Sequence, residues 1–437
     1  MLDIKLIREN PEMVRANLER RQQPEKLLLL QGVVDTDKRW RELTANMNKL
    51  RKRRNEVSQE IAQAMKSGKD ASSLKSEASK IPEQLKIIET ELEERQAFVK
   101  NGLMRLPNML HESVPYGKDD HDNVVVKVWG EPPRFGFSPS SHAELSQNLG
   151  IADFERGAKV TGTGFYYLRN EMVLLDYSIM RYAMDLLISR GYSVIEPPYM
   201  IKRSYYEGVT DLADFENVMY RIEDSENPKD HLYLIATSEH PMGAMLKDEI
   251  VNADQLPIKM CGVSPCFRRE IGSHGKYTKG IFRVHQFNKI EQFIFCLPED
   301  SWKFHEELQG NCEALYEGLG IHYRVVNVCT GDIGSIAAKK YDTEAWMADG
   351  EYREVGSNSN CTDYQARRLN ARYRMKEGQA PVGFLHTLNN TAIATSRTMI
   401  MVIEQYQQAD GTIRVPKALQ KYMGMEVIEG KLNKMKI

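Results

Sequence analysis

Two ladders of apolar positions, spaced by three and four residues, dominate the N-terminal quarter of the chain. The first ladder consists of Trp40, Leu43, Met47, Leu50, Val57, Ile61 and Ala64. The second consists of Leu74, Ala78, Ile81, Leu85, Ile88, Leu92 and Val99. Such spacing is typical of coiled coils, and the short polar segment 67–70 predicts an antiparallel helical hairpin over about residues 30–102. Because proline removes a helical hydrogen bond, we expect a kink or a new helix start at Pro82.

The pattern changes after residue 106. A polar segment rich in glycine and proline predicts a linker, and from Arg169 onward helical and strand-like segments alternate. Residues 172–190 have the period of an amphipathic helix that ends at Gly191. Residues 192–195, 232–236, 258–263, 282–295, 322–328 and 352–355 are β-like, and residues 385–406 lead from a strand into a helix. This irregular order indicates an α+β fold with a mainly antiparallel sheet.

Composition narrows the kinds of partner. The 437 residues allow two or more domains, and a net charge of −2 gives no global attraction to polyanions. Nucleic-acid binding would therefore depend on local basic patches. The candidates are Lys49, Arg51, Lys52, Arg53 and Arg54 in the first ladder, and Arg268, Arg269, Lys276, Lys279 and Arg283 further along. The second ladder is acidic, so the first patch could instead be a solvated surface of cross-paired charges.

Several classes of protein are disfavoured. The chain has no signal-peptide pattern and no apolar stretch near the ~20 residues of a membrane span, which predicts a soluble cytoplasmic protein. Its six cysteines lack metal-site spacing, so we expect buried thiols. The sequence contains neither G-x-G-x-x-G before a helix nor a P-loop. Any nucleotide site must therefore be built differently.

The segment 266–291 offers such a site. Two β-like stretches, one carrying Arg268 and Glu270 and the other carrying Arg283, Phe287 and Glu291, flank a basic loop rich in glycine. Arginine offers a planar fork of donors to phosphate, glutamate accepts from an exocyclic amine, and phenylalanine stacks on a base. Taken alone, the same pattern also fits an exposed hairpin with a charged solvent face.

Three further clusters place polar groups inside apolar segments. They are 237–239 (Thr-Ser-Glu), 351–360 (Glu-Tyr-Arg-Glu-Val-Gly-Ser-Asn-Ser-Asn) and 388–398, which ends in Thr-Ser-Arg-Thr. Each could be a capped helix or a core ion pair. Together they provide arginines for phosphate and a Glu/Ser pair for a divalent ion, which suits a nucleoside triphosphate site without a P-loop lysine.

Over its whole length the chain resembles the seryl-tRNA synthetases, class II aminoacyl-tRNA synthetases. The resemblance includes the start Leu2-Asp-Ile-Lys, the helical arm, Thr237-Ser-Glu, Phe267-Arg-Arg-Glu, Glu354-Val-Gly-Ser and Val415-Pro-Lys-Ala-Leu-Gln. It implies an N-terminal tRNA-binding domain over 1–110, a linker over 111–136 and a class II catalytic domain over 137–437. Helix 172–190 would be motif 1, the hairpin motif 2, and Arg397 with its helix motif 3.

The resemblance also implies roles. ATP would be bound by Arg268, Arg269, Glu270, Arg283, Val284, Phe287, Glu354, Val355, Gly356, Ser357 and Arg397, with Arg268 and Arg397 catalytic and Mg²⁺ on Glu354 and Ser357. L-serine would be bound by Thr237, Ser238, Glu239, Arg268, Glu291 and Thr391. tRNA(Ser), with tRNA(Sec) as a second candidate, would contact Lys49, Arg51, Lys52, Arg53, Arg54, Lys276 and Lys279. The family further implies a homodimer.

Three positions depart from the family pattern. Thr391 and Gly356 stand where serine is common, and Ser396 stands where glycine is usual. Two other functions compete with tRNA charging: a non-catalytic module that binds tRNA or protein, and an enzyme that makes aminoacyl adenylate for a carrier protein. The intact charged set argues against the first, and the helical arm argues against the second.

Overall fold

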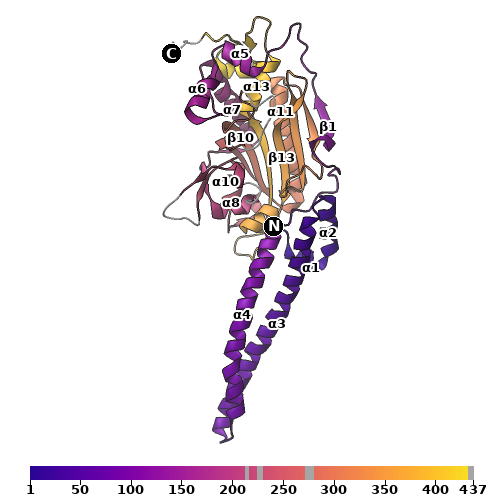
Figure 1. The fold of residues 1–437 in the computed structure, drawn as a ribbon, viewed down its shortest axis with the longest axis vertical. Coiled ribbons are helices and arrows are strands. Elements are labelled where there is room, and N and C mark those ends of the chain that lie inside the picture. Colours follow the sequence, from indigo (N-terminus) through magenta and orange to yellow (C-terminus); the bar gives the residue numbers. More distant parts are fainter. Residues whose placement is uncertain (212–215, 224–229, 271–279, 432–437) are drawn as a thin grey trace. The chain divides into compact units, whose positions relative to one another are not determined.

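The computed structural model describes residues 1–211, 216–223, 230–270 and 280–431. The chain divides into two compact units, Met1–Met109 and Leu110–Ile437. Figure 1 traces both units in the colours of the sequence.

The N-terminal unit is helical: α1 (Ile4–Glu9), α2 (Pro11–Arg20), α3 (Glu25–Lys66) and α4 (Ser72–Arg105). Asn10 caps α2 by accepting a hydrogen bond from the Met13 amide, with Pro11 at the first helical position. Helices α3 and α4 run side by side (Figure 1), and their ladders meet in a cluster of Leu43, Ile88 and Leu92. The predicted helical hairpin is confirmed.

No new helix starts at Pro82, because α4 continues through this residue without a break. Ile81 and Leu85, on either side of the proline, are 3% and 5% exposed. Burial of this apolar stripe stabilises the helix through tertiary packing, which outweighs the hydrogen bond that proline removes.

The larger unit is built on one eight-stranded sheet. In spatial order its strands are β1 (Val124–Trp129), β11 (Tyr323–Asn327), β12 (Lys339–Trp346), β13 (Tyr352–Thr362), β16 (His386–Ala394), β10 (Gln286–Cys296), β9 (Ile258–Phe267) and β4 (Ser193–Ile195). Every neighbouring pair is antiparallel except β4 and β9. The prediction of a mainly antiparallel sheet is confirmed.

Three helices supply most of the apolar side chains that cover the sheet: α7 (Glu171–Ser189), α11 (Ser301–Leu319) and α13 (Thr395–Gln405). Figure 1 shows α11 and α13 beside the central strands. The shorter helices are α5 (His142–Asn148), α6 (Phe154–Thr161), α8 (Arg203–Val209), α10 (Glu239–Ala244), α12 (Tyr364–Leu369) and α14 (Lys417–Met423).

Small sheets complete the unit. They are β2 (Ala152–Asp153) with β3 (Tyr167–Leu168); β5 (Met200–Lys202), β7 (Leu232–Leu234) and β6 (Arg221–Ile222); β15 (Gly383–Phe384), β14 (Arg372–Arg374) and β8 (Ile250–Asn252); and β17 (Ile413–Arg414) with β18 (Val427–Ile428).

The segment 111–136, for which composition predicts a linker, contains the edge strand β1, paired with β11. Four valines in Val124–Trp129 favour a strand. The strand is largely exposed, so it lacks the alternation of apolar and polar residues that marks a half-buried strand, and the glycines and prolines around it favoured a linker.

Candidate active site

The hairpin predicted around residues 266–291 is formed by β9 and β10, which pair from Gln286 opposite Phe267 to Phe295 opposite Ile258. Side chains two residues apart on a strand share a face, so Phe287, Lys289 and Glu291 line one face of β10. The connecting loop, residues 271–279, includes the predicted tRNA contacts Lys276 and Lys279 and lies outside the described residues.

Arg268 follows the end of β9 and lies beside Phe287. Its guanidinium carbon is 5.2 Å from the centroid of the Phe287 ring, and its Nε donates to the Ala236 carbonyl at 3.3 Å. The His285 carbonyl accepts a hydrogen bond from the Arg268 amide at 2.9 Å, which fixes this strand end. The guanidinium thus adjoins both an aromatic face and the segment that leads to Thr237.

Glu270 and Arg283 lie together at the mouth of the hairpin, where an Arg283 nitrogen is 3.5 Å from a Glu270 carboxylate oxygen. Glu270 has φ of +43°, a region that non-glycine residues seldom occupy, so its backbone is held by its surroundings. Arg269 is exposed, and its amide donates to the Val218 carbonyl at 2.9 Å.

Arg397, in the first turn of α13, faces β13. Its Nη1 donates to the Glu354 carbonyl oxygen at 2.5 Å and lies 3.6 Å from the Glu354 carboxylate. The guanidinium carbon is 4.9 Å from the centroid of the Phe282 ring. Each of the two arginines predicted to be catalytic is therefore placed over an aromatic ring.

These elements enclose one cleft with about 420 Å³ of empty space, its open mouth included. Its lining contains Arg268, Glu270, Phe282, Val284, Phe287, Lys289, Glu354, Val355, Gly356, Thr391, Ala394, Ser396 and Arg397. The structure thus brings together residues that follow β9 with residues of β10, β13, β16 and α13, over a sequence separation of more than a hundred positions. Of the residues predicted for ATP, Arg269, Arg283 and Ser357 do not line this cleft.

The residues predicted to bind serine surround Glu239 at the start of α10. The Glu239 Oε1 accepts hydrogen bonds from Asn389 Nδ2 at 3.1 Å and Gln365 Nε2 at 3.3 Å. Burial and the neighbouring Glu291 carboxylate raise the pKa of Glu239 to about 7. Ser238, the residue before it, is fully buried.

Glu291 and Thr391 meet across the pairing of β10 and β16, where the Thr391 hydroxyl donates to Glu291 Oε2 at 3.3 Å. Lys289 was not predicted as a site residue. Its ammonium pairs with the same Glu291 oxygen and donates to the Thr237 hydroxyl at 2.5 Å. The alternation of Phe287, Lys289 and Glu291 along one strand was the available signal.

The predicted magnesium ligands lie at one end of β13. Desolvation opposes ionisation of Glu354, but Arg397 and Lys340 outweigh it and lower the pKa of this carboxyl group. Ser357 pairs in register with Asp342 of β12, and its hydroxyl lies against the Asp342 carboxylate. Among the described residues, Asp342 Oδ1 is buried without a hydrogen-bond partner. Carboxylate and hydroxyl oxygens suit a hard divalent cation, so the donor set fits Mg²⁺.

Two of the three departures from the family pattern are neighbours in space. A Cβ atom added to Gly356 would lie 3.1 Å from the Thr391 carbonyl oxygen and 3.8 Å from the Thr391 Cβ. The absence of a side chain at 356 therefore leaves room beside the extra methyl group at 391. Ser396, the third departure, is 2% exposed.

The basic patch on α3 divides into two kinds of residue. Arg51 pairs with Glu89 of α4 at 2.9 Å, and Arg53 pairs with Glu77 of α4 at 2.7 Å. These two residues match the alternative prediction, a solvated surface of cross-paired charges. Lys52 lies 3.8 Å from Glu56 within its own helix. Lys49 and Arg54 are exposed and form no ion pair with a described residue.

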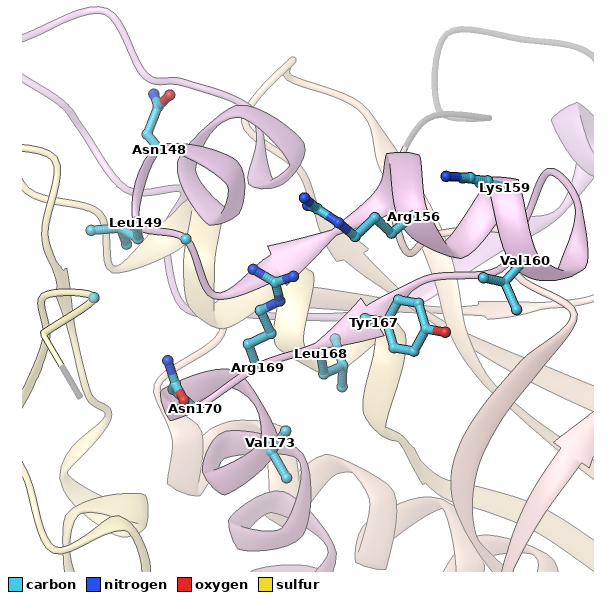
Figure 2. Close-up of a pocket in the computed structure, with 12 residues that line it drawn as sticks. Asn148, Leu149, Arg156, Lys159, Val160, Tyr167, Leu168, Arg169, Asn170 and Val173 are labelled. Atoms are coloured by element: carbon cyan, nitrogen blue, oxygen red, sulfur yellow. The ribbon is translucent and has the colours of Figure 1, made fainter. Parts of the chain in front are cut away.

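A second cavity, with about 1560 Å³ of empty space when its open mouth is included in the same way, shares no lining residue with the cleft. Figure 2 shows Arg156 and Lys159 reaching it from α6 and Tyr167 from β3, with Val173 at the start of α7. Arg156 and Arg169 pair with the same Asp153 oxygen, at 2.8 and 2.7 Å. Sequence reasoning assigned no role to this region.

No helix in the described part of the chain is long and apolar enough to span a membrane.

The sheet and cleft are those of a class II aminoacyl-tRNA synthetase, and residues 220–406 match the family described as tRNA synthetase class II core domain (G, H, P, S and T). Residues 1–110 match the seryl-tRNA synthetase N-terminal domain. A relative from Methanocella arvoryzae, named Serine--tRNA ligase, is 54% identical over 98% of this chain and 100% of its own length.

Solved structures agree. Seryl-tRNA synthetase from Pyrococcus horikoshii complexed with ATP is 46% identical, with a TM-score of 0.94 over 98% of this chain and 99% of that one. Cytoplasmic serine-tRNA ligase from Naegleria fowleri in complex with AMP is 35% identical, with a TM-score of 0.89 over 98% of both chains. The chain belongs to the seryl-tRNA synthetase family.

Proposed function

We propose that this protein activates L-serine with ATP and transfers the seryl group to the 3′ end of tRNA. The serine carboxylate attacks the α-phosphorus in line, pyrophosphate leaves, and the terminal ribose hydroxyl of tRNA then displaces AMP from the adenylate. The observation that carries the proposal is the position of Arg268, between the Phe287 ring and the segment that leads to Thr237. There it can contact both reactants.

The ATP half of the cleft works by charge and stacking. Phe287 offers a face to the adenine, and Glu270 offers an acceptor to its amino group. Arg268 would bind the α-phosphate, while Arg283 and Arg397 would hold the outer phosphates, because guanidinium forks match phosphate oxygens. No protein nucleophile is required, so positioning and neutralisation of developing charge supply the acceleration.

The serine half selects by polarity and size. Glu239 and Thr237 would contact the ammonium, and Glu291 with Thr391 would contact the hydroxyl. Alanine would leave the buried Glu291 without this partner, a loss of about 1–3 kcal/mol, and the close walls oppose the extra methyl group of threonine.

Glu354 and Ser357 would hold Mg²⁺. Asp342, which is in register with Ser357, would orient the hydroxyl of Ser357. When bound, the ion would supply positive charge that offsets the negative charge of the phosphates.

For tRNA, the exposed Lys49, Lys52 and Arg54 offer cations to the backbone of an elongated tRNA, a contact that reads shape and phosphate. tRNA(Ser) is the proposed substrate, and tRNA(Sec) stays a second prediction for the same assay. The cytoplasm, where ATP and tRNA are both available, is the proposed location.

A homodimer is supported by an uncovered apolar stripe on α7. Leu174, Tyr177 and Ile188 are 41%, 63% and 50% exposed, and the neighbouring elements β4 and β5 expose Val194 and Met200. Exposed apolar groups at this density suit an isologous contact with a second copy. Sedimentation velocity should give twice the monomer mass for the wild type and a monomer for the double variant Tyr177→Asp, Ile188→Asp; a dimeric variant would contradict this interface.

The function is tested by serine-dependent exchange of pyrophosphate into ATP, followed by charging of purified tRNA(Ser). We expect both activities. Deleting residues 35–100 should leave exchange intact and abolish charging; unchanged charging would contradict the role of the arm. Exchange without charging by the full chain would favour an enzyme that supplies a carrier protein, and the absence of both would favour a binding module.

A further inference from the structure

Lys289 is a buried cation in the pocket assigned to serine, with no role in the function described above. Its side chain is 5% exposed, and that of its partner Glu291 is 2% exposed. A buried charge is costly unless it is paired, so an ion pair this deep needs a structural or a functional reason.

The geometry joins Lys289 to both ends of the pocket. Its ammonium pairs with Glu291 Oε2, the same oxygen that accepts from the Thr391 hydroxyl at 3.3 Å. It also donates to the Thr237 hydroxyl at 2.5 Å, and that hydroxyl accepts from the Glu239 amide at 3.2 Å. One ammonium thus connects the residues assigned to the hydroxyl of serine with those assigned to its amino group.

The charges around it do not balance. Two carboxylates, Glu239 and Glu291, lie nearest one lysine, while Arg268 acts on Glu239 from its place beside Phe287, where it is assigned to the α-phosphate. Once Arg268 is engaged by ATP and both carboxylates are ionised, the pocket holds one uncompensated negative charge. A substrate ammonium supplies the missing positive charge.

We propose that Lys289 is a positioning residue for the amino acid: it neutralises Glu291 and holds the Thr237 hydroxyl in place, so that Glu239 is the one carboxylate left to pair with the substrate ammonium. The pocket then accepts one cation, and Glu291 is free to accept a hydrogen bond from a neutral hydroxyl. This inference rests on the proposed function, because it takes the occupant to be a zwitterionic amino acid.

The electrostatics of Glu239 support this division. Burial and the Glu291 carboxylate raise its pKa, while Lys289 opposes them. Other groups also face Glu239 from the elements around it. They are Arg268 after β9, Tyr206 of α8, Gln365 of α12, Cys361 of β13 and Asn389 of β16. Removing Lys289 should therefore make Glu239 harder to ionise and weaken its attraction for an ammonium.

The test compares Lys289→Met with Lys289→Arg and with the double variant Lys289→Met, Glu291→Gln in pyrophosphate exchange. Lys259→Met is the matched control, since Lys259 lies on the neighbouring strand β9 and pairs with Glu307 of α11, outside the pocket assigned to serine. We expect Lys289→Met to raise the serine KM about tenfold to a hundredfold, the factor for losing a hydrogen bond to a charged group, with the ATP KM unchanged. Lys289→Arg should recover part of the loss, and the control should behave as the wild type.

A pH profile separates positioning from mere structural support. The midpoint of the serine kcat/KM should move upward by about one pH unit in Lys289→Met and below the wild-type value in the double variant, where no second carboxylate opposes Glu239. A folded Lys289→Met with a wild-type serine KM and midpoint would overturn the proposal. If that variant does not fold, an unmoved midpoint in the double variant overturns it instead. A wild type without serine-dependent exchange would refute the proposed function rather than this inference.

Discussion

Replacing Glu239 with glutamine should stabilise the free protein while it removes serine activation. The pKa of this carboxyl group rises from 4.5 to about 7 on folding, chiefly through burial. The folded protein therefore binds more protons than the unfolded chain between these pH values, and its stability falls as pH rises through this window. At 1.36 kcal/mol for each pKa unit, the loss is about 3 kcal/mol by pH 8.

Glutamine has no ionisable proton, so the stability of Glu239→Gln should not show this decline with rising pH. The free energy of unfolding, measured by chemical denaturation without substrates, should exceed that of the wild type by about 0 at pH 4.5 and by up to about 3 kcal/mol at pH 8. Saturating serine provides a control: it should stabilise the wild type at pH 8 and leave the variant unchanged, since only the wild type offers a carboxylate to the ammonium. A stability difference that does not change with pH would refute the reasoning.

Further variants probe the site and the arm. Arg268→Ala should slow pyrophosphate exchange by roughly 10² or more, because it removes a cation from the reacting phosphate; near-normal exchange would show that its role is wrongly assigned. The double variant Lys49→Glu, Arg54→Glu should lower tRNA charging at least about tenfold with exchange unchanged, while Arg51→Gln, which breaks a pair with Glu89, should have a smaller effect; equal losses would exclude the distinction. Gly356→Ser should raise the serine KM, since its Cβ would press on the Thr391 carbonyl at 3.1 Å, and the companion change Thr391→Ser should relieve part of that increase.

The sequence predicted best those elements whose structure follows from a local pattern of residues. The ladders from Trp40 to Val99 predicted the α3–α4 hairpin because coiled-coil packing repeats along the chain. Phe287 and Glu291 share a face of β10 because they are an even number of residues apart on one strand, and the sequence pattern had placed both on one β-like stretch of the candidate site.

Long-range packing limited the rest of the prediction. Strand alternation puts Lys289 on the same face as Phe287 and Glu291, but it does not show that the lysine is buried, because its burial depends on β16 and on the segment leading into α10. Asp342 is likewise indistinguishable from a surface residue until the register of β12 and β13 sets it beside Ser357. The helix start expected as one alternative at Pro82 is wrong for the same reason, since the packing that keeps α4 continuous comes from another helix.

The central claim is that one cleft joins ATP and serine at a single reacting centre. Rapid-quench measurement of adenylate formation with radiolabelled ATP tests it most directly. Mixing the wild type with ATP, Mg²⁺ and serine should give a burst of seryl adenylate that approaches one molecule per site, with little adenylate from alanine or threonine under the same conditions. No adenylate with serine, or equal bursts with all three amino acids, would contradict the claim.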